Sequence, residues 1–452
     1  MMDDPSPRVR HAVLGVIGNL SFEQEPLYQL HTHATVMPLL IRGLSDASVR
    51  VRAQAAMAIT AFVNPLRCDI DTDKEVLEPY LDAALRSLFG MLSGSEDRFC
   101  REQAITTMSA LAEAAPSFMP PYYDIIIPGV KLILAMPDVL VDATSLRAAG
   151  GASLDHHTRS TMRARQAEAR HVRIMKGRAL ECLTVVGAAV GPDRFRPDAT
   201  MAMSGIVAMI AQMTHDKELQ RAAEAAGVPY MGLSPADDPV PRFMWEAVGR
   251  IARTLGAAEF APYLSVVLPP LVEEVERKAE LILVNKRAHD DGLGGDEEEE
   301  GDEEEDDEDG QFTHMQEGRQ QLKVRTAALE DKCAAIVAIR HIAEHSRGVT
   351  LAPFVPTLSA AIMPLLQTGG TPFDEIRAAS AAAIVQLLAS NASALNVPDV
   401  LATHAALMAG AEASTLPHVA VLAHMNMLYL AVYTLLEACV HEREHCYMRQ
   451  RA

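Results

Sequence analysis

The sequence predicts an all-α fold in which antiparallel helix pairs stack in a row. The chain has 452 residues, which is more than one hydrophobic core usually supports. Apolar residues make up 49% of it but aromatic residues only 5%, so the apolar content is mainly Ala, Leu, Val, Ile and Met, an inventory that favours helices. A basic residue also recurs at regular spacing. Each helix pair would therefore pack only on its neighbours.

The recurring element is Asp-x4-Val-Arg. In its fullest copy Asp46 precedes Val51-Arg52, and apolar residues follow at helical spacing. Successive basic positions lie 42, 49 and 45 residues apart in three cases, which brackets the ~40–47 residue period of HEAT repeats. We therefore predict a HEAT-repeat α-solenoid, a right-handed superhelix of helix pairs. The basic positions of the copies are Arg10, Arg52, Arg101, Arg178, Lys332 and Arg377.

A proline marks the first helix of each predicted pair. Inside a helix, proline removes a backbone donor and causes a kink, so a proline at the same place in each pair bends these helices alike. Uniform bending is what a curved stack requires. The prolines occur in Pro-x-Leu or Pro-x-Val at Pro38, Pro128, Pro269 and Pro364.

The second helices are predicted to be straight and amphipathic, as the stripe Ala179, Cys182, Leu183 and Val186 indicates. An aspartate before such a helix, as at Asp46, can cap free N–H groups. We interpret the recurrent Arg or Lys as an architectural residue that pairs with the turn aspartate of a neighbouring unit rather than with a ligand.

Two stretches interrupt the period. Residues 139–170 are predicted to be an inserted loop followed by a basic helix, and residues 285–322 a disordered acidic loop, because carboxylates without apolar anchors cannot offset the entropy of ordering. HEAT repeats are expected at 1–138, 171–284 and 323–452. The acidic loop is interpreted either as a solubilising linker or as a mimic that competes for basic ligands. Its carboxylates are Asp296, Glu297, Glu298, Glu299, Glu300, Asp302, Glu303, Glu304, Glu305, Asp306, Asp307, Glu308 and Asp309.

Four segments resemble the karyopherin-β (importin-β) family, and specifically its importin-5, or karyopherin-β3, type. The most specific is Thr326-Ala-Ala-Leu-Glu-Asp-Lys332, which follows the acidic loop and Phe312 in the family's order. The other segments are Met175–Cys182, Asp237-Asp238-Pro239 and Tyr263-Leu264. The resemblance covers about residue 79 to the C-terminus and corresponds to the middle of a longer family member. Because residues 4–20 are predicted to be a second helix without its first, we expect a fragment or a truncated gene model.

The resemblance implies nuclear import. Family members bind lysine-rich nuclear import signals or basic cargo such as ribosomal proteins and histones, contact Phe-Gly nucleoporins, release cargo to RanGTP, and shuttle between cytoplasm and nucleus. The family's main RanGTP site lies nearer its N-terminus, outside the segments matched here, so RanGTP remains a possible partner by resemblance only.

Carboxylates beside the second helices are the candidate cargo-binding groups. Exposed ion pairs contribute only roughly 0.2–1 kcal/mol each, whereas micromolar binding needs about −8 kcal/mol, so many contacts must act together with packing of lysine stems. For any single carboxylate, a solvated or locally paired role is the simpler interpretation. The candidates are Glu181, Glu246, Glu330, Asp331, Glu344, Asp374 and Glu375.

Composition excludes several other classes. The formal charge is −20, and without the acidic loop the chain still has 40 basic against 47 acidic residues, which argues against nucleic acid and favours basic protein partners. The six cysteines form no CxxC pair, which fits a reducing compartment. No secretory signal or membrane-spanning stretch is recognised. We expect no membrane contact, no cofactor and no bound metal.

One sequence looks like a metal site. His441-Glu-Arg-Glu-His445 matches HExxH, in which two histidines bind zinc and the glutamate activates water. Only seven residues follow His445, which leaves no room for a third ligand at the usual spacing, and His156-His157 has no partner cluster. We therefore expect no catalytic residues.

The main alternative to a transport receptor is a HEAT-repeat scaffold without transport activity. An importin-α type adaptor and a zinc hydrolase fit the sequence less well.

Overall fold

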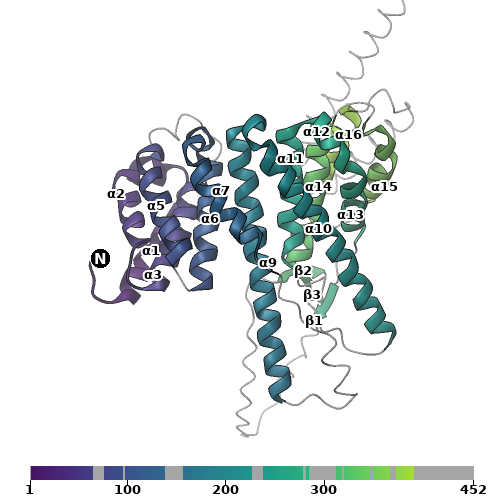
Figure 1. The fold of residues 1–452 in the computed structure, drawn as a ribbon. Coiled ribbons are helices and arrows are strands. Elements are labelled where there is room, and N and C mark those ends of the chain that lie inside the picture. The colour runs from purple at the N-terminus through teal and green to yellow at the C-terminus, as the bar shows by residue number, and fades with distance from the viewer. Residues whose placement is uncertain are drawn as a thin grey trace, which may run out of the picture. The chain divides into compact units, whose positions relative to one another are not determined.

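The computed structural model describes residues 2–64, 76–94, 97–137, 156–226, 238–277, 281–284, 312–317, 320–346, 350–366 and 373–390. These residues form helices almost throughout (Figure 1), which confirms the predicted all-α HEAT-type fold. The chain divides into two compact units, one of residues 1–267 with 344–350 and the other of residues 268–343 with 351–452.

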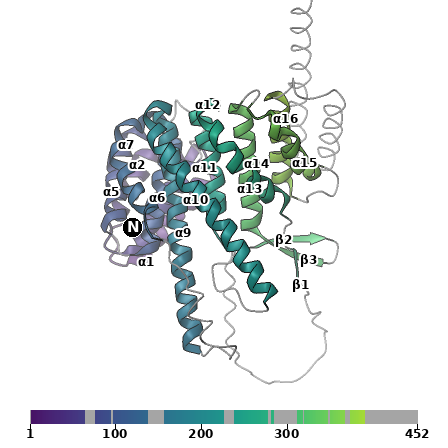
Figure 2. The ribbon, with the colours of Figure 1, turned by 45° about the vertical axis from the view of Figure 1, so that its right-hand side comes forward.

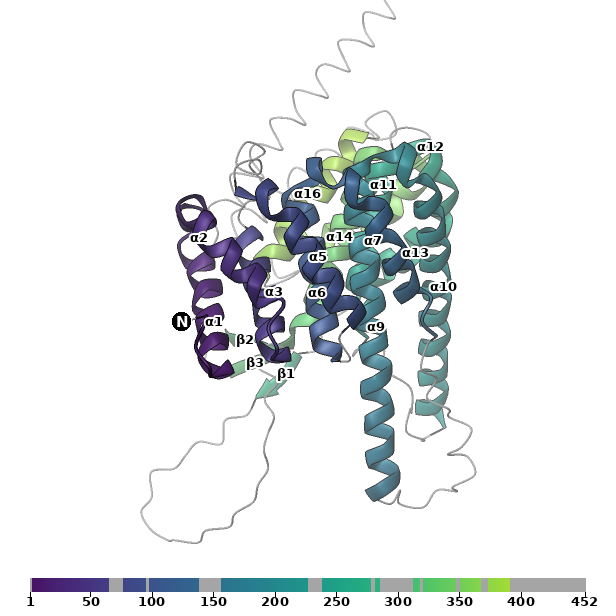
Figure 3. The ribbon, with the colours of Figure 1, turned by 60° about the vertical axis from the view of Figure 1, so that its left-hand side comes forward.

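The first unit consists of two rows of helices. One row contains the second helices of the pairs, packed side by side in chain order, as Figure 3 shows for the first four. They are α1 (Pro7–Glu23), α3 (Val49–Val63), α6 (Arg98–Ala114), α9 (His156–Val190) and α11 (Val240–Leu255).

The other row contains the first helices. Among them α2 packs on α3, α5 on α6, and both α7 and α10 on α9. They are α2 (Leu27–Gly43), α5 (Glu78–Gly94), α7 (Tyr123–Leu134) and α10 (Pro192–Ala225), and the short α12 (Ala257–Phe260) follows α11. The first half of α9 and the second half of α10 extend beyond the other helices of the unit (Figure 2). Residues 156–170 of the predicted insertion thus open α9, while residues 139–155 lie outside the described part of the chain.

The second unit begins within α13 (Leu264–Glu276) and continues with α14 (Thr326–His345), α15 (Val355–Leu366) and α16 (Asp374–Ser390), of which α15 packs on α16. Pro38, Pro128, Pro269 and Pro364 all lie inside first helices, namely α2, α7, α13 and α15. The predicted proline pattern is therefore confirmed.

A small antiparallel sheet accompanies these helices and was not predicted. It has the order β1 (Leu281–Val284), β3 (Gln320–Arg325), β2 (Phe312–Glu317), with Leu283 opposite Leu322 and Phe312 opposite Arg325. β3 runs directly into α14. The strands at 312–317 and 320–322 fall inside the range expected to be disordered, so the acidic loop ends earlier than predicted; residues 285–311, including the acidic tract, lie outside the described residues.

The recurrent arginines follow the predicted ladder only in part. Arg10 on α1 donates from Nε and Nη2 to both carboxylate oxygens of Asp46 in the next turn, at 2.7 and 2.9 Å. On α9 the residue that reaches the next turn aspartate, Asp238, is Arg173, and Arg178 instead pairs with Glu181 in its own helix. Because α9 continues helically from residue 156, no turn precedes Arg178, and an arginine earlier in the helix reaches the neighbouring turn.

The two basic positions of the second unit also depart from the ladder. The Lys332 ammonium donates to the main-chain oxygens of Val275 and Arg277 at the end of α13, at 2.9 Å for Val275. Arg377 pairs with Asp374 in its own first turn. Both contacts hold helix ends, so the architectural interpretation stands although the partners differ.

Close packing between α9 and α10 depends on Gly187. A β-carbon at this position would lie 2.3 Å from the ring of Phe195, which is fully buried. We expect Gly187→Ala to lower the free energy of unfolding by about 1–3 kcal/mol, the usual cost of overpacking. Urea denaturation followed by circular dichroism measures this. Gly205→Ala on α10 is the control: nothing lies within 4 Å of its β-carbon position, so it should be neutral or stabilising. Equal stability of the two variants would contradict the packing argument.

No described helix is long and apolar enough to cross a membrane. Among the described residues, Cys100, Cys182 and Cys333 are free thiols. Cys182 is buried as predicted, and burial raises the pKa of its thiol to about 12, whereas Cys333 is partly exposed.

Candidate functional site

Three neighbouring second helices, α6, α9 and α11, bring charged side chains together in the first unit. We call these side chains the charged strip. Each lies on a helix whose apolar face is fixed in the core, so the backbone positions of the charges are set by the packing of the row. The charged strip consists of Glu102, Glu113, Arg178, Glu181, Arg242, Glu246 and Arg250.

Glu181, one of the sequence-predicted residues, is paired within its own helix. Arg178 Nη1 donates to Glu181 Oε2 at 3.1 Å, three residues away on α9. The guanidinium of Arg178 also lies 4.8 Å from the centre of the Phe243 ring on α11, a distance at which a cation is attracted to the ring face. Arg178 therefore binds α9 to α11 and holds Glu181 at the same time.

Glu246, also predicted from the sequence, belongs to a longer chain of ion pairs. It accepts from Arg242 at 3.4 Å and from Arg250 at 3.1 Å, both on α11. Arg250 reaches Glu113 on α6 at 3.3 Å, although α9 lies between α6 and α11 in the row. This chain of ion pairs thus joins α11 to α6. A positive ligand that binds Glu246 must compete with two arginines.

Glu102 on α6 is a carboxylate that the sequence analysis missed. Its side chain is half-buried, and in the described residues it makes no ion pair within 4 Å. Burial raises the pKa of Glu102, while Arg178 and Arg170 act in the opposite direction from a greater distance. The carboxylate is therefore partly desolvated without a partner that compensates for it. Glu102 directly follows Arg101, one of the recurrent basic positions, but no local pattern in the sequence marks its burial.

The other predicted carboxylates lie elsewhere. Four belong to the second unit: Glu330 is exposed, Asp331 is buried, Asp374 pairs with Arg377, and Glu375 is exposed in the first turn of α16. Glu330, Asp331 and Asp374 all have interaction partners. The structure thus places Glu181 and Glu246 together in the charged strip but assigns these four to a different unit.

Glu344 belongs to the first unit, and its carboxylate lies 4.0 Å from His345 Nδ1. Asp374 and Glu375 stand in the first helical turn of α16, where a negative charge complements the helix dipole. Their positions are thus explained by helix stabilisation. The acidic tract Asp296–Asp309 lies outside the described residues.

Metal chemistry has no candidate in the described part of the chain, where no three His, Cys, Asp or Glu side chains group to hold an ion. His441–His445 lies outside the described residues, and so do the side chains of His156-His157, whose backbone opens α9.

Comparisons with known proteins agree with this architecture. A HEAT-repeat family model matches residues 36–65, which cover the end of α2 and all of α3. Importin subunit beta-3 of Saccharomyces cerevisiae is 25% identical over 449 residues, which is 98% of this chain and 34% of the yeast protein. The crystal structure of Kap121p bound to Nup53p matches 94% of this chain and 33% of its own with a TM-score of 0.61 and 25% identity.

A second solved structure, Kap121p bound to Pho4p, matches 94% of this chain and 34% of its own, again with a TM-score of 0.61 and 25% identity. The chain therefore spans about one third of the length of these relatives. The match extends along nearly all of this chain and is not confined to the repeat that the family model recognises.

Proposed function

We propose that the chain acts as part of a nuclear transport receptor. The proposal rests on its resemblance to karyopherin-β proteins, which extends over nearly the whole chain. We further propose that its charged strip binds lysine-rich segments of basic cargo, including nuclear import signals. Its relatives are transport receptors and not enzymes. In solved structures, the similar Kap121p is bound to Nup53p and to Pho4p, which supports both a nucleoporin and a cargo as partners.

The observation that supports this proposal is the partial burial of the Glu102 carboxylate. A half-buried carboxylate without an ion pair has lost part of its hydration and gained no fixed charge partner. The ammonium group of a cargo lysine would supply that partner as a charge-assisted hydrogen bond. A lysine bound there would offset the desolvation of the Glu102 carboxylate, which is already present in the free receptor.

The paired carboxylates should contribute less. A lysine that approaches Glu181 or Glu246 must displace or share an arginine already within 3.1 Å. The exchange of one ion pair for another gives little net free energy. These residues would instead keep the strip polar and hold the three helices in register, while Glu102 provides the anchor.

The remaining partners follow from the same kinship. We propose that Phe-Gly nucleoporins are a second class of ligand and that the chain shuttles between cytoplasm and nucleus. The other candidate function, a HEAT-repeat scaffold without transport, is favoured by the extensive pairing of Arg242, Glu246, Arg250 and Glu113, which would hold the helices in place whether or not cargo binds.

A salt series separates these two functions. We expect a fluorescein-labelled lysine-rich signal peptide to bind the full chain, with an affinity that falls steadily between low and high salt because exposed charges are screened over about 10 Å at 0.1 M ionic strength. Fluorescence anisotropy measures this. A peptide in which glutamine replaces every lysine is the control and should not bind. Absent binding, or binding that is unchanged at high salt, would support the scaffold instead.

A further inference from the structure

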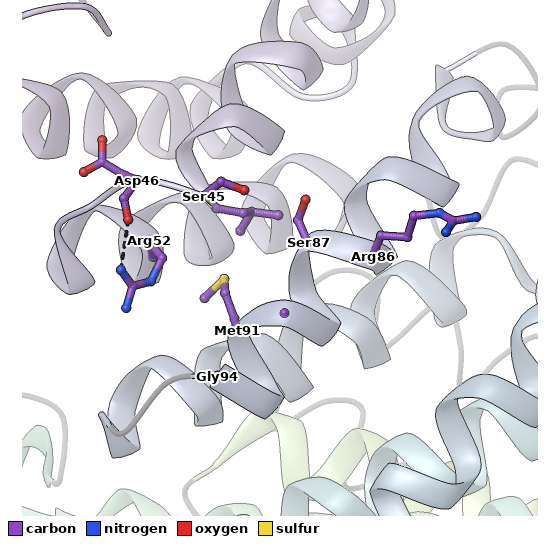
Figure 4. Close-up of a pocket in the computed structure, with 9 residues that line it drawn as sticks. Ser45, Asp46, Arg52, Arg86, Ser87, Met91 and Gly94 are labelled. Carbon is purple, nitrogen blue, oxygen red and sulfur yellow. Dashed lines mark hydrogen bonds between the residues drawn. The ribbon is translucent and has the colours of Figure 1, made fainter.

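A cavity of about 540 Å³ lies in the first unit between the α2–α3 turn and the second half of α5 (Figure 4). Two glycines one turn apart on α5, Gly90 and Gly94, leave it open, since no atom lies within 4 Å of either β-carbon position. Leu44 and Met91 line it and are themselves almost fully buried. The cavity therefore has a mixed lining, in which these two apolar side chains lie beside the polar Ser45, Asp46 and Ser87, next to a stretch of helix without side chains.

Arg52 supplies a fixed positive charge at the edge of this cavity. Its Nη1 donates to the main-chain oxygens of Asp46 at 2.9 Å and Ala47 at 3.3 Å, and Figure 4 shows the first of these bonds. Two carbonyls that hold one nitrogen restrict the guanidinium without neutralising it. No carboxylate pairs with Arg52 within the described residues.

The nearby Asp46 carboxylate is occupied elsewhere. It accepts both Nε and Nη2 of Arg10, at 2.7 and 2.9 Å, and the backbone N–H of Ser48 at 2.8 Å. In Figure 4 the carboxylate points away from Arg52. These bonds use the oxygens that would otherwise approach Arg52, so Arg52 acts on Asp46 only through space and its remaining N–H donors stay available to a ligand.

Arg86 on α5 adds a second and looser positive charge. Its Nε donates to Asp82 at 2.8 Å, but the two side chains are 79% and 58% exposed. Such a surface pair is weak. A carboxylate that is held in place or less hydrated would therefore compete with Asp82 for Arg86.

We propose that this cavity binds an acidic segment of a partner protein in which a glutamate or aspartate stands beside an aliphatic residue. Arg52 would receive the carboxylate in a charge-assisted pair, and the aliphatic side chain would lie on Leu44 and Met91 above the glycines. The volume is in the range that suits a few residues of a peptide rather than a lone anion. This site is independent of the charged strip, whose proposed ligand is basic.

Fluorescence anisotropy tests the proposal with the full chain and a labelled peptide, Gly-Glu-Leu-Glu-Leu-Gly. We expect binding that weakens about tenfold in Arg52→Gln, through loss of the charge-assisted pair. We expect a similar loss in Gly90→Leu, which fills the cavity and leaves Arg52 untouched. Arg50→Gln, which removes an exposed arginine from the same helix, is the matched control and should bind like the unaltered chain.

Three outcomes would overturn the proposal. The first is that the peptide does not bind the unaltered chain. The second is that a peptide with glutamine in place of glutamate binds as tightly as the original peptide. The third is that Arg50→Gln weakens binding as much as Arg52→Gln does. Gly90→Leu protects the test against misfolding, because its new side chain enters open space on a helix, where leucine is favoured over glycine. Since the lysine-rich peptide serves as a separate probe, failure here leaves the transport proposal standing.

Discussion

Glu102→Gln is expected to weaken binding of a lysine-rich signal peptide by about ten- to a hundredfold. A hydrogen bond to a charged group contributes about 1.5–3 kcal/mol, and each 1.4 kcal/mol is tenfold in affinity. The glutamine keeps the shape of the side chain and removes its charge. The same variant should be at least as stable as the unaltered chain, because a half-buried carboxylate without an ion pair is removed. Anisotropy and thermal denaturation measure the two effects.

The control is Glu218→Gln on α10, an exposed glutamate in the same unit that is not part of the charged strip. It makes the same change in net charge and should alter peptide affinity less than twofold, the small effect expected of screened surface charge. Glu181→Gln should fall between the two, since its carboxylate already holds Arg178. If Glu102→Gln and Glu218→Gln behave alike, the peptide responds to overall charge and Glu102 is not its anchor.

The repeat period made most of the fold predictable. Arg10, Asp46 and Arg52 belong to successive copies of the repeat, and the Arg10–Asp46 pair was expected because in stacked helix pairs this basic position commonly pairs with the turn aspartate of the neighbouring unit. The same logic failed at Arg178, because α9 runs for 35 residues without the turn that sets the register in the other units. It also failed at Arg52, where the period holds but the guanidinium contacts only the main-chain oxygens of Asp46 and Ala47. Periodicity thus predicted the helices better than the individual contacts.

The candidate site was predictable only in part. Pairs such as Arg178 with Glu181 and Arg242 with Glu246 lie three or four residues apart, a spacing from which contact on a helix follows. The contact of Glu113 with Arg250 joins residues 137 positions apart and depends on how α6 and α11 lie beside α9. Partial burial of Glu102 likewise arises from tertiary packing, which no local pattern encodes. The sheet joins β1 to β3 across the acidic loop, so local alternation alone did not reveal it.

Arg173→Met is expected to give the largest loss of stability. Arg173 on α9 pairs with Asp238, which is buried in the turn before α11, and with Asp216 on α10 at 3.1 Å. Methionine keeps the length of the side chain and leaves Asp238 buried without its guanidinium. Removal of one partner of a buried pair costs about 3–5 kcal/mol. Guanidinium denaturation followed at 222 nm, compared with the unaltered chain at pH 7, measures this loss.

An exposed pair of similar architecture provides the control. Arg196 on α10 contacts both oxygens of Glu259 on α12 at 2.9 Å, but the side chains are 48% and 37% exposed. Arg196→Met also breaks an ion pair between two helices, so burial is the main difference between the two variants. We expect a loss below about 1 kcal/mol for this surface pair. Equal losses would show that the Arg173–Asp238 contact gains nothing from its burial.

The pH dependence distinguishes a stranded charge from simple loss of packing. Burial raises the pKa of Asp238, and the positive charge of Arg173 works against that rise; without Arg173 the folded pKa must be higher still. The folded state then binds a proton that the unfolded state, with an aspartate pKa near 3.9, has already released. Between these two pKa values the unfolding free energy of Arg173→Met therefore increases as the pH falls.

The loss of unfolding free energy in Arg173→Met, relative to the unaltered chain, should be smaller at pH 5 than at pH 7. The double variant Arg173→Met with Asp238→Asn should not show this pH dependence. A deficit that is the same at both pH values would mean that packing, and not the charge of Asp238, accounts for the loss.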